Sequence, residues 1–277
     1  MGERHNPLLI QGDSKTRDFS LDALRLQQNV SLKRINQRRA LLGEIETNAG
    51  AFRLAGQVVS QLDRHRASAY SLLRNRAGEI MDLKRESAKV REQYGKTMVG
   101  QSLLMARRLV EAEIPLVSVN WEDETKIDGV NTCWDTHQKN FPKLKNLLCP
   151  IFDQAFPAFI NDLSERGLLE TTLVVAVGEF GRTPQLGQFS QSSNTKKTGR
   201  DHWPSAFTAI VAGGGTKGGQ VYGATNRHAA FVKDDPVSPA DLTATILSHL
   251  GVDPTTTYVD DIQKLRHRLS DGRVVPL

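Results

Sequence analysis

The 277-residue chain lacks the features that mark several classes of protein. It has only two cysteines, Cys133 and Cys149, which form no metal or redox motif. Whether they pair stays open, and two cysteines do not define a redox compartment. No apolar run approaches the length of a membrane span. Residues 1–6 are polar and the apolar run at 7–10 is too short for a signal peptide. The sequence therefore predicts a globular protein without a membrane span.

Repeats, low-complexity tracts and a phosphate-binding fingerprint are also missing. The glycine run at 213–215 has neither the spacing of such a fingerprint nor a helix directly after it, so it predicts a turn. The formal net charge is +5. Much of the excess comes from Arg and Lys in the first hundred or so residues, where acidic residues alternate with them, which indicates a solvated helical surface. We therefore predict no nucleic-acid partner.

Residues 1–99 are predicted to form a helical N-terminal region. Apolar residues recur with helical period from Leu21 to Ile45 after the capping residue Ser20, and a second helical tract covers residues 51–94, ending at Gly95. No residue of this region suggests chemistry. It is interpreted as a helical layer or an appendage.

Residues 100–277 are predicted to form an α/β region. Short apolar runs at 114–121, 171–177 and 206–212 predict strands, and the run at 171–177 is typical of a strand buried on both faces. Helical spacing precedes each of the first two runs, and Pro150 and Pro157 are expected to divide the second helical tract into two helices. A capping Ser238 starts a last helix. This alternation predicts an α/β fold with a predominantly parallel sheet flanked by helices.

Three clusters near the predicted strands combine carboxylate, imidazole and guanidinium groups. Their members are Asp135 with His137, Glu179 with Arg182, and Asp201 with His202. Carboxylate oxygens and imidazole nitrogens suit divalent metals, and strand ends in α/β sheets are where sites form. A metal ion held there would polarise a phosphoryl or sulfuryl oxygen, and an arginine would bind a non-bridging oxygen of the anion.

Each cluster also has a purely structural interpretation, and these alternatives stay open from the sequence. His202 can be a structural histidine, Asp135 can cap the helix that follows it, and Glu179 can pair with Arg182. Four other histidines show no comparable partner and are assigned to surface or core roles; they are His65, His228, His249 and His267.

These motifs resemble the bacterial family DUF1501, which is common in planctomycetes, from about residue 6 onward. The matching stretches are residues 100–104, Trp-Asp-Thr-His at 134–137, Glu-Phe-Gly-Arg-Thr-Pro at 179–184, Gly-Arg-Asp-His-Trp-Pro at 199–204, 212–215, 239–247 and 250–251. The family is in turn similar to the alkaline phosphatase, sulfatase and phosphoglycerate mutase superfamily. The resemblance implies an alkaline phosphatase-like fold and a site that holds divalent metal ions.

Under this resemblance the metal ligands are Asp135 and His137 as one pair, Glu179 at the strand end, and His202 as the late ligand. Asp201 is a further ligand or orients an imidazole, and Arg182 binds the anion. The superfamily usually has Asp-His where this chain has Glu179-Phe180. It also has an early strand with an Asp and a nucleophile, which is not found here, so the nucleophile stays unknown. The chain is therefore expected to be the C-terminal part of a longer protein and an incomplete domain.

The resulting hypothesis is a metal-dependent hydrolase that acts on sulfate or phosphate esters of an anionic small molecule or glycan. Whether this fragment is active stays open, because no nucleophile is identified. The alternative is a non-catalytic module that binds an anionic glycan, or an envelope partner through residues 20–94. Members of the family often carry a twin-arginine export signal, which implies an exported protein if the full-length chain has one. The metal, the substrate and the oligomeric state are left open.

Overall fold

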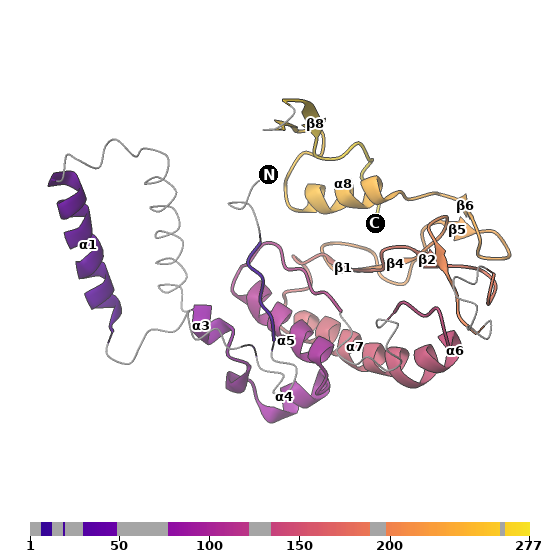
Figure 1. Ribbon diagram of the computed structural model, residues 1–277, viewed down its shortest axis with the longest axis horizontal. Helices are drawn as coiled ribbons and strands as arrows, with labels where there is room; N and C mark the ends of the chain where they lie inside the picture. The colour runs from indigo at the N-terminus through magenta and orange to yellow at the C-terminus, as the bar shows by residue number, and fades with distance from the viewer. Residues whose placement is uncertain are drawn as a thin grey trace. The chain divides into compact units, whose positions relative to one another are not determined.

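The computed structural model describes residues 7–12, 19, 30–48, 77–121, 134–188, 198–260 and 264–277. The chain divides into two units (Figure 1). One unit is Ile10–Ala88, and the other joins Met1–Leu9 to Lys89–Leu277. The predictions for Ser20 and for most of the helical tract at 51–94 lie outside the described residues. The predicted domain boundary between residues 99 and 100 stays a prediction.

The first unit contains helix α1 (Leu32–Asn48), helix α3 (Ala77–Ile80) and the short 3₁₀-helix η4 (Leu83–Arg85). The helix predicted from Leu21 to Ile45 is not continuous, because residues 30 and 31 are not helical and α1 begins at Leu32. The Oγ atom of Ser31 accepts a hydrogen bond from the backbone N–H of Arg34 at 3.2 Å, as an N-capping serine does. The later part of the predicted helix is confirmed.

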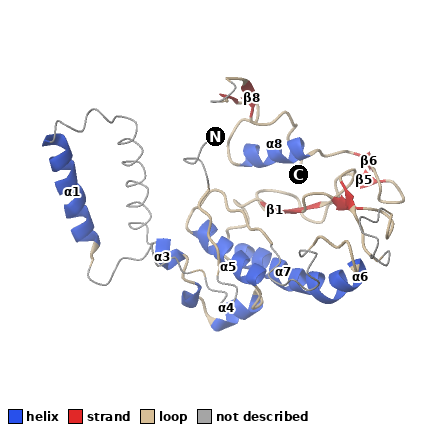
Figure 2. Cartoon of the chain, viewed as in Figure 1, coloured by secondary structure: helices blue, strands red, loops and turns tan. Residues whose placement is uncertain are grey.

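The second unit begins with a series of helices, drawn in blue in Figure 2. Its helices are α4 (Ala88–Gln93), α5 (Met98–Glu111), α6 (Asn140–Lys143), the π-helix η5 (Leu144–Leu148) and α7 (Cys149–Glu165). Helix α5 packs against α7. Each of the two helices is amphipathic and buries its apolar face. The side chains of Leu104 in α5 and Leu163 in α7 are fully buried. This helix pair forms the apolar core of the unit.

Helix α7 continues through Pro157, so the prediction that this proline separates two helices is wrong. Proline removes one backbone N–H from the helix ladder, which leaves the carbonyl of Asp153 without that partner. Both residues are exposed, so water can solvate the carbonyl. Meanwhile Ala155, Phe159 and Leu163, spaced four apart, stay buried on one side of the helix. Packing of that face outweighs the propensity of a single residue. Pro150, by contrast, lies in the first turn, where its missing N–H costs nothing.

A buried ion-pair network joins α5 to α7. The Arg107 side chain is only 1% exposed; its Nη1 lies 2.6 Å from Glu111 Oε2 and its Nε lies 2.9 Å from Asp162 Oδ2. Arg166 Nε pairs with Asp162 Oδ1 at 2.6 Å, and Tyr94 Oη donates to Asp162 Oδ2 at 2.8 Å. Burial raises the pKa of Asp162, but the hydrogen bonds from Arg166 and Tyr94 outweigh it and lower the pKa overall. The two helices are thus fixed by charge as well as by apolar contact.

The described strands form four two-stranded antiparallel sheets. Strand β1 (Val174–Val177) pairs with β4 (Ala209–Ala212), which confirms strands within the runs predicted at 171–177 and 206–212. Strand β2 (Gly181–Arg182) pairs with β3 (His202–Trp203). The residues of β1 are half-buried or exposed, not buried on both faces as expected. Residues 114–121 are described but form no strand. The alkaline phosphatase-like fold with a predominantly parallel sheet stays a prediction.

The C-terminal part of the unit contains helix α8 (Pro239–His249). In Figure 1 the β1–β4 pair runs between α8 on one side and α5 and α7 on the other. Ser238 and Asp241 form a capping box at the start of α8, which confirms the predicted cap. The predicted turn at 213–215 is also confirmed, because all three glycines have positive φ angles.

Two small hairpins complete the unit. Strand β5 (Ala224–Thr225) pairs with β6 (Val232–Asp234), and β7 (Thr257–Val259) pairs with β8 (Arg266–Arg268). None of the helices within the described ranges is long and apolar enough to cross a lipid bilayer.

Candidate metal centre

Two segments that are distant in the sequence are joined by backbone hydrogen bonds at the candidate site. The N–H of Arg200 donates to the carbonyl of Thr136 at 3.1 Å, and the N–H of Asn140 donates to the carbonyl of Thr198 at 3.0 Å. A Cβ atom on Gly199 would lie 1.7 Å from the carbonyl oxygen of His137, so only glycine fits there. These contacts bring the Asp135–His137 cluster beside the Asp201–His202 cluster.

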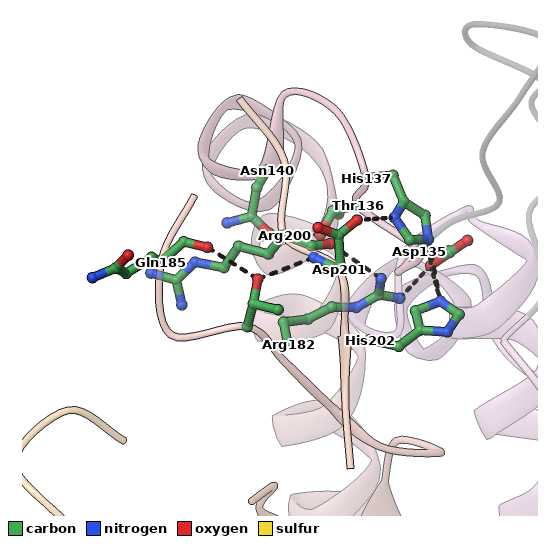
Figure 3. Close-up of polar contacts among 10 residues, drawn as sticks. Asp135, Thr136, His137, Asn140, Arg182, Gln185, Arg200, Asp201 and His202 are labelled. Carbon is green, nitrogen blue, oxygen red and sulfur yellow. Dashed lines mark hydrogen bonds and ion pairs between the residues drawn. The ribbon is translucent and has the colours of Figure 1, made fainter. Parts of the chain in front are cut away.

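Arg182 of the third cluster joins them through the β2–β3 ladder. Arg182 lies directly opposite His202 in the register, and Gly181 lies opposite Trp203. The N–H of Thr183 donates to the carbonyl of Asp201 at 2.9 Å, and its Oγ1 accepts the N–H of Asp201 at 3.1 Å. Arg182 and His202 are therefore neighbours because of strand pairing, as Figure 3 shows.

Asp135, His137 and His202 form what we call the ligand triad. The Oδ1 atom of Asp135 lies 3.0 Å from Nε2 of His137 and 3.0 Å from Nε2 of His202, and the two Nε2 atoms are 3.2 Å apart. The side chains are 32%, 19% and 47% exposed, in the same order. Three potential ligand atoms thus form a nearly equilateral triangle at the protein surface.

The triangle has the dimensions of one face of a metal coordination polyhedron. Ligand atoms about 2.1 Å from one ion are separated by about 3.0 Å in octahedral and about 3.4 Å in tetrahedral coordination. The three separations of 3.0, 3.0 and 3.2 Å fall in this interval. Two imidazole nitrogens and one carboxylate oxygen also form a donor set that zinc, manganese or iron accepts. The ligand triad therefore fits a divalent metal ion, and it is a group of residues that could hold one.

Asp201 supports the ligand triad from behind His137. Its Oδ1 lies 3.0 Å from Nδ1 of His137, on the opposite side of the ring from Nε2 (Figure 3). A carboxylate only accepts hydrogen bonds, so a neutral His137 carries its proton on Nδ1 and directs the Nε2 lone pair into the triad. This carboxylate–histidine arrangement is common behind metal ligands. Of the two roles expected for Asp201, orientation of an imidazole is the one its contact supports.

Arg182 makes the shortest contact with the ligand triad. Its Nη2 lies 2.5 Å from Oδ1 of Asp135, and its Nη1 donates to the carbonyl of Arg200 at 3.4 Å. Partial burial raises the pKa of Asp135, but hydrogen bonds from Arg182 and His202, with the nearby Arg182 charge, outweigh it and lower the pKa overall. Asp135 is therefore ionised at neutral pH. The alternative in which Asp135 caps a helix is not supported, because the N-cap of α6 is Lys139.

Glu179 is not in the group of converging ligand atoms, so its role as a metal ligand stays a prediction. Its side chain is exposed and it is not a member of the triad. The alternative in which it pairs with Arg182 is not supported either, since Arg182 pairs with Asp135. Glu179 lies in the short connection between β1, which ends at Val177, and β2, which begins at Gly181. Phe180 instead packs on His202, with 4.3 Å between ring centroids.

Sequence reasoning missed several residues that position the ligands. The hydroxyl of Thr136 donates to Oδ1 of Asn140 at 2.6 Å, and the hydroxyl of Thr183 donates to the carbonyl of Gln185 at 3.0 Å while accepting from Asp201. Both threonines are buried. Their position inside the motifs at 134–137 and 179–184 was the only signal. Both hydroxyls are engaged in fixed hydrogen bonds, so neither is free to act as a nucleophile.

Other candidate features lie apart from the triad. A pocket of about 500 Å³ is lined by Phe141, Pro142, Leu144, Lys145, Asn146 and Cys149, and it contains no triad residue. Cys149 is a free thiol. The other histidines within the described residues are exposed, as expected for surface roles; they are His228, His249 and His267. His65 lies outside the described residues.

Comparisons with known proteins identify one family. Its model carries the description "Protein of unknown function (DUF1501)" and matches residues 1–276. No curated protein and no solved structure matches the chain.

Proposed function

The chain belongs to the DUF1501 family, and on that premise we propose that it is a metal-dependent hydrolase of phosphate or sulfate esters with an alkaline phosphatase-like fold. The observation that carries the proposal is the ligand triad, in which Asp135 Oδ1 and the Nε2 atoms of His137 and His202 are 3.0 to 3.2 Å apart. The second observation is the carboxylate of Asp201 on the far nitrogen of His137. A set of ligands that is partly open to solvent and has this support behind it is typical of a catalytic metal site.

The protein groups have separate roles in this proposal. Asp135, His137 and His202 hold the ion, and Asp201 fixes the ring of His137. A divalent ion held there would act as a Lewis acid toward a phosphoryl or sulfuryl oxygen. The guanidinium of Arg182 has five N–H donors. Its Nη2 contacts Asp135, and other N–H groups remain to bind an anionic oxygen. The site thus combines a cation-binding face with an adjacent anion-binding side chain.

A non-catalytic role is the second candidate, and a specific observation favours it. The two threonine hydroxyls beside the triad, on Thr136 and Thr183, are buried and engaged. No side-chain nucleophile is therefore available from the described motifs. Under this alternative the metal ion and Arg182 form a binding site for a phosphorylated or sulfated glycan, and no ester bond is cleaved.

Metal analysis of the purified chain tests the proposal. After dialysis against zinc or manganese, we expect about one equivalent of ion per chain, because three ligands of the right type converge. His137→Ala and His202→Ala should each remove most of it. His228→Ala is the matched control, since it deletes an exposed imidazole outside the triad. Less than about a tenth of an equivalent in the unaltered chain would contradict the proposal, given the affinities usual for such donor sets.

Activity then separates the two candidates. The metal-loaded chain is incubated with aryl phosphate and aryl sulfate esters, with and without chelator. The hydrolase predicts turnover that chelator and His202→Ala both abolish. Binding of a sulfated glycan without turnover, lost in Arg182→Gln, would favour the non-catalytic module.

A further inference from the structure

The surroundings of Asp135 decide how many metal ions the centre holds. Hydrolases with two metal ions place them about 3.5–4 Å apart, usually with a carboxylate between them. The Oδ1 atom of Asp135 lies beside the Nε2 atoms of both imidazoles, which is the arrangement expected when all three atoms bind one ion. The same atom, however, already carries Nη2 of Arg182 at 2.5 Å. A positive charge of the protein therefore occupies a place beside the shared carboxylate.

The other described neighbours of the triad provide no second set of ligands. Phe180 packs against the ring of His202 and has no atom that binds a metal. Asp201 is turned to Nδ1 of His137 and is 10% exposed. Among the residues that the structure describes, the triad is the one group of three His, Cys, Asp or Glu side chains with converging ligand atoms.

We infer that this centre binds one metal ion per chain and that the guanidinium of Arg182 replaces the second cation of a two-metal site. The inference rests on the proposed metal site and adds its stoichiometry and the role of Arg182. The guanidinium is charged at every accessible pH, whereas an exchangeable ion depends on its concentration. Arg182 is held in place by the β2–β3 ladder and by the carbonyl of Arg200. It therefore supplies a permanent positive charge to the carboxylate and to an anion bound beside it.

A permanent charge next to a ligand has a measurable consequence for the metal ion. The repulsion between the guanidinium and the ion weakens metal binding, while the hydrogen bond to Asp135 orients the ligand and strengthens it. Arg182→Lys and Arg182→Gln both lose the planar fork, but only the lysine variant keeps the positive charge. Comparison of these two variants therefore isolates the charge from the orientation.

Calorimetric titration of the metal-free chain with zinc chloride is the test. The unaltered chain should bind one ion per chain. Arg182→Gln should bind zinc at least about tenfold more tightly than Arg182→Lys, because a unit charge is removed within a few ångströms of the ion. The matched controls are Arg200→Lys and Arg200→Gln. The Arg200 side chain points away from the imidazoles (Figure 3), so this pair should differ by less than threefold, roughly the scatter expected of distant charges.

The outcomes are distinct. Two ions per unaltered chain, or equal zinc affinities for the lysine and glutamine variants at position 182, would overturn the inference while leaving the proposed metal site intact. Absence of any zinc binding would instead remove the proposed function itself. The stoichiometry of the unaltered chain requires no substitution, so it holds as a test even if a variant folds poorly. Circular dichroism of each variant checks folding before titration.

Discussion

Two clusters of charge in the same unit show the difference between a structural network and a candidate site. Between α5 and α7 the guanidinium groups of Arg107 and Arg166 face the carboxylates of Glu111 and Asp162, so the charges are balanced. Arg107 is 1% exposed. At the ligand triad, one carboxylate faces a guanidinium and two imidazoles, and the imidazole of His202 is about half exposed.

The difference lies in what the groups do for the fold. In the helix pair each buried charge needs its partner, because an unpaired charge in the interior is very costly. At the triad the Nε2 atoms of the two imidazoles meet at a half-buried carboxylate, and water could replace any of these contacts. A convergence of ligand atoms that folding does not need indicates binding. Removal of a charge from the helix pair should therefore lower stability. Removal of a group from the candidate site should instead lower metal affinity.

The largest effect is expected from Arg107→Ala. This change removes the buried guanidinium but leaves Asp162 and Glu111 paired with Arg166. It should lower the free energy of unfolding by about 1.5–3 kcal/mol, as for lost hydrogen bonds to charged groups, measured by urea denaturation. Lys96→Ala, which removes an exposed ion pair with Glu92, is the control and should have no measurable effect. A loss below about 1 kcal/mol for Arg107→Ala, within the range of surface pairs, would mean that the two clusters do not differ in this way.

The opposite pattern is expected from Asp201→Asn. The amide keeps the size of the side chain but no longer matches the Nδ1–H of His137 as a charged acceptor does. Metal affinity should fall about 10–100-fold, as for other residues behind metal ligands, with the free energy of unfolding little changed. Titration calorimetry measures the first and urea denaturation the second. Asp271→Asn, at an 85% exposed position, is the control. Unchanged zinc affinity would remove Asp201 from the site.

The smallest effect concerns Asp241, which gathers hydrogen bonds without being a ligand. It accepts the backbone N–H groups of Ser238 and Arg273, both at 2.7 Å, and these bonds lower its pKa from 3.8 to about 2. The folded-state pKa lies below the unfolded value, so the stabilisation is complete above about pH 4 and is lost as the pH falls toward 2. Thermal melting of the unaltered chain and Asp241→Asn should therefore differ at pH 5 and converge near pH 2. A constant difference would contradict this explanation.

Local sequence patterns predicted the elements that depend on local energetics. The capping Ser238 with Asp241 three residues later determines the start of α8, and the glycines at 213–215 accept the positive φ angles of the turn. Patterns failed where tertiary packing decides, as in α7, which tolerates Pro157 because its opposite face is buried. The run at 114–121 has a strand pattern, but a strand also needs a partner, which a pattern does not specify.

The candidate site was predicted in its residue types and only partly in its membership. Asp135, His137 and His202 converge as expected, whereas Glu179 is exposed and is not in the group of converging ligand atoms. Successive side chains of a strand point to opposite faces, so a shift of one residue in the start of β2 would reverse which side chains face the triad. The spacing of residues along the chain does not reveal where the strand starts. The contact between Asp201 and Nδ1 of His137 likewise depends on segments brought together only by folding.

The close approach at Gly199 has a consequence for how this protein tolerates mutation. Even a methyl group at this position would collide with the backbone of His137 and force apart the two segments that carry the imidazoles. Gly199, which has no side chain, thus controls whether the imidazoles of His137 and His202 meet. Saturation mutagenesis guided only by polar or ionisable residues would overlook it, and any redesign of the ligands has to keep this glycine unchanged.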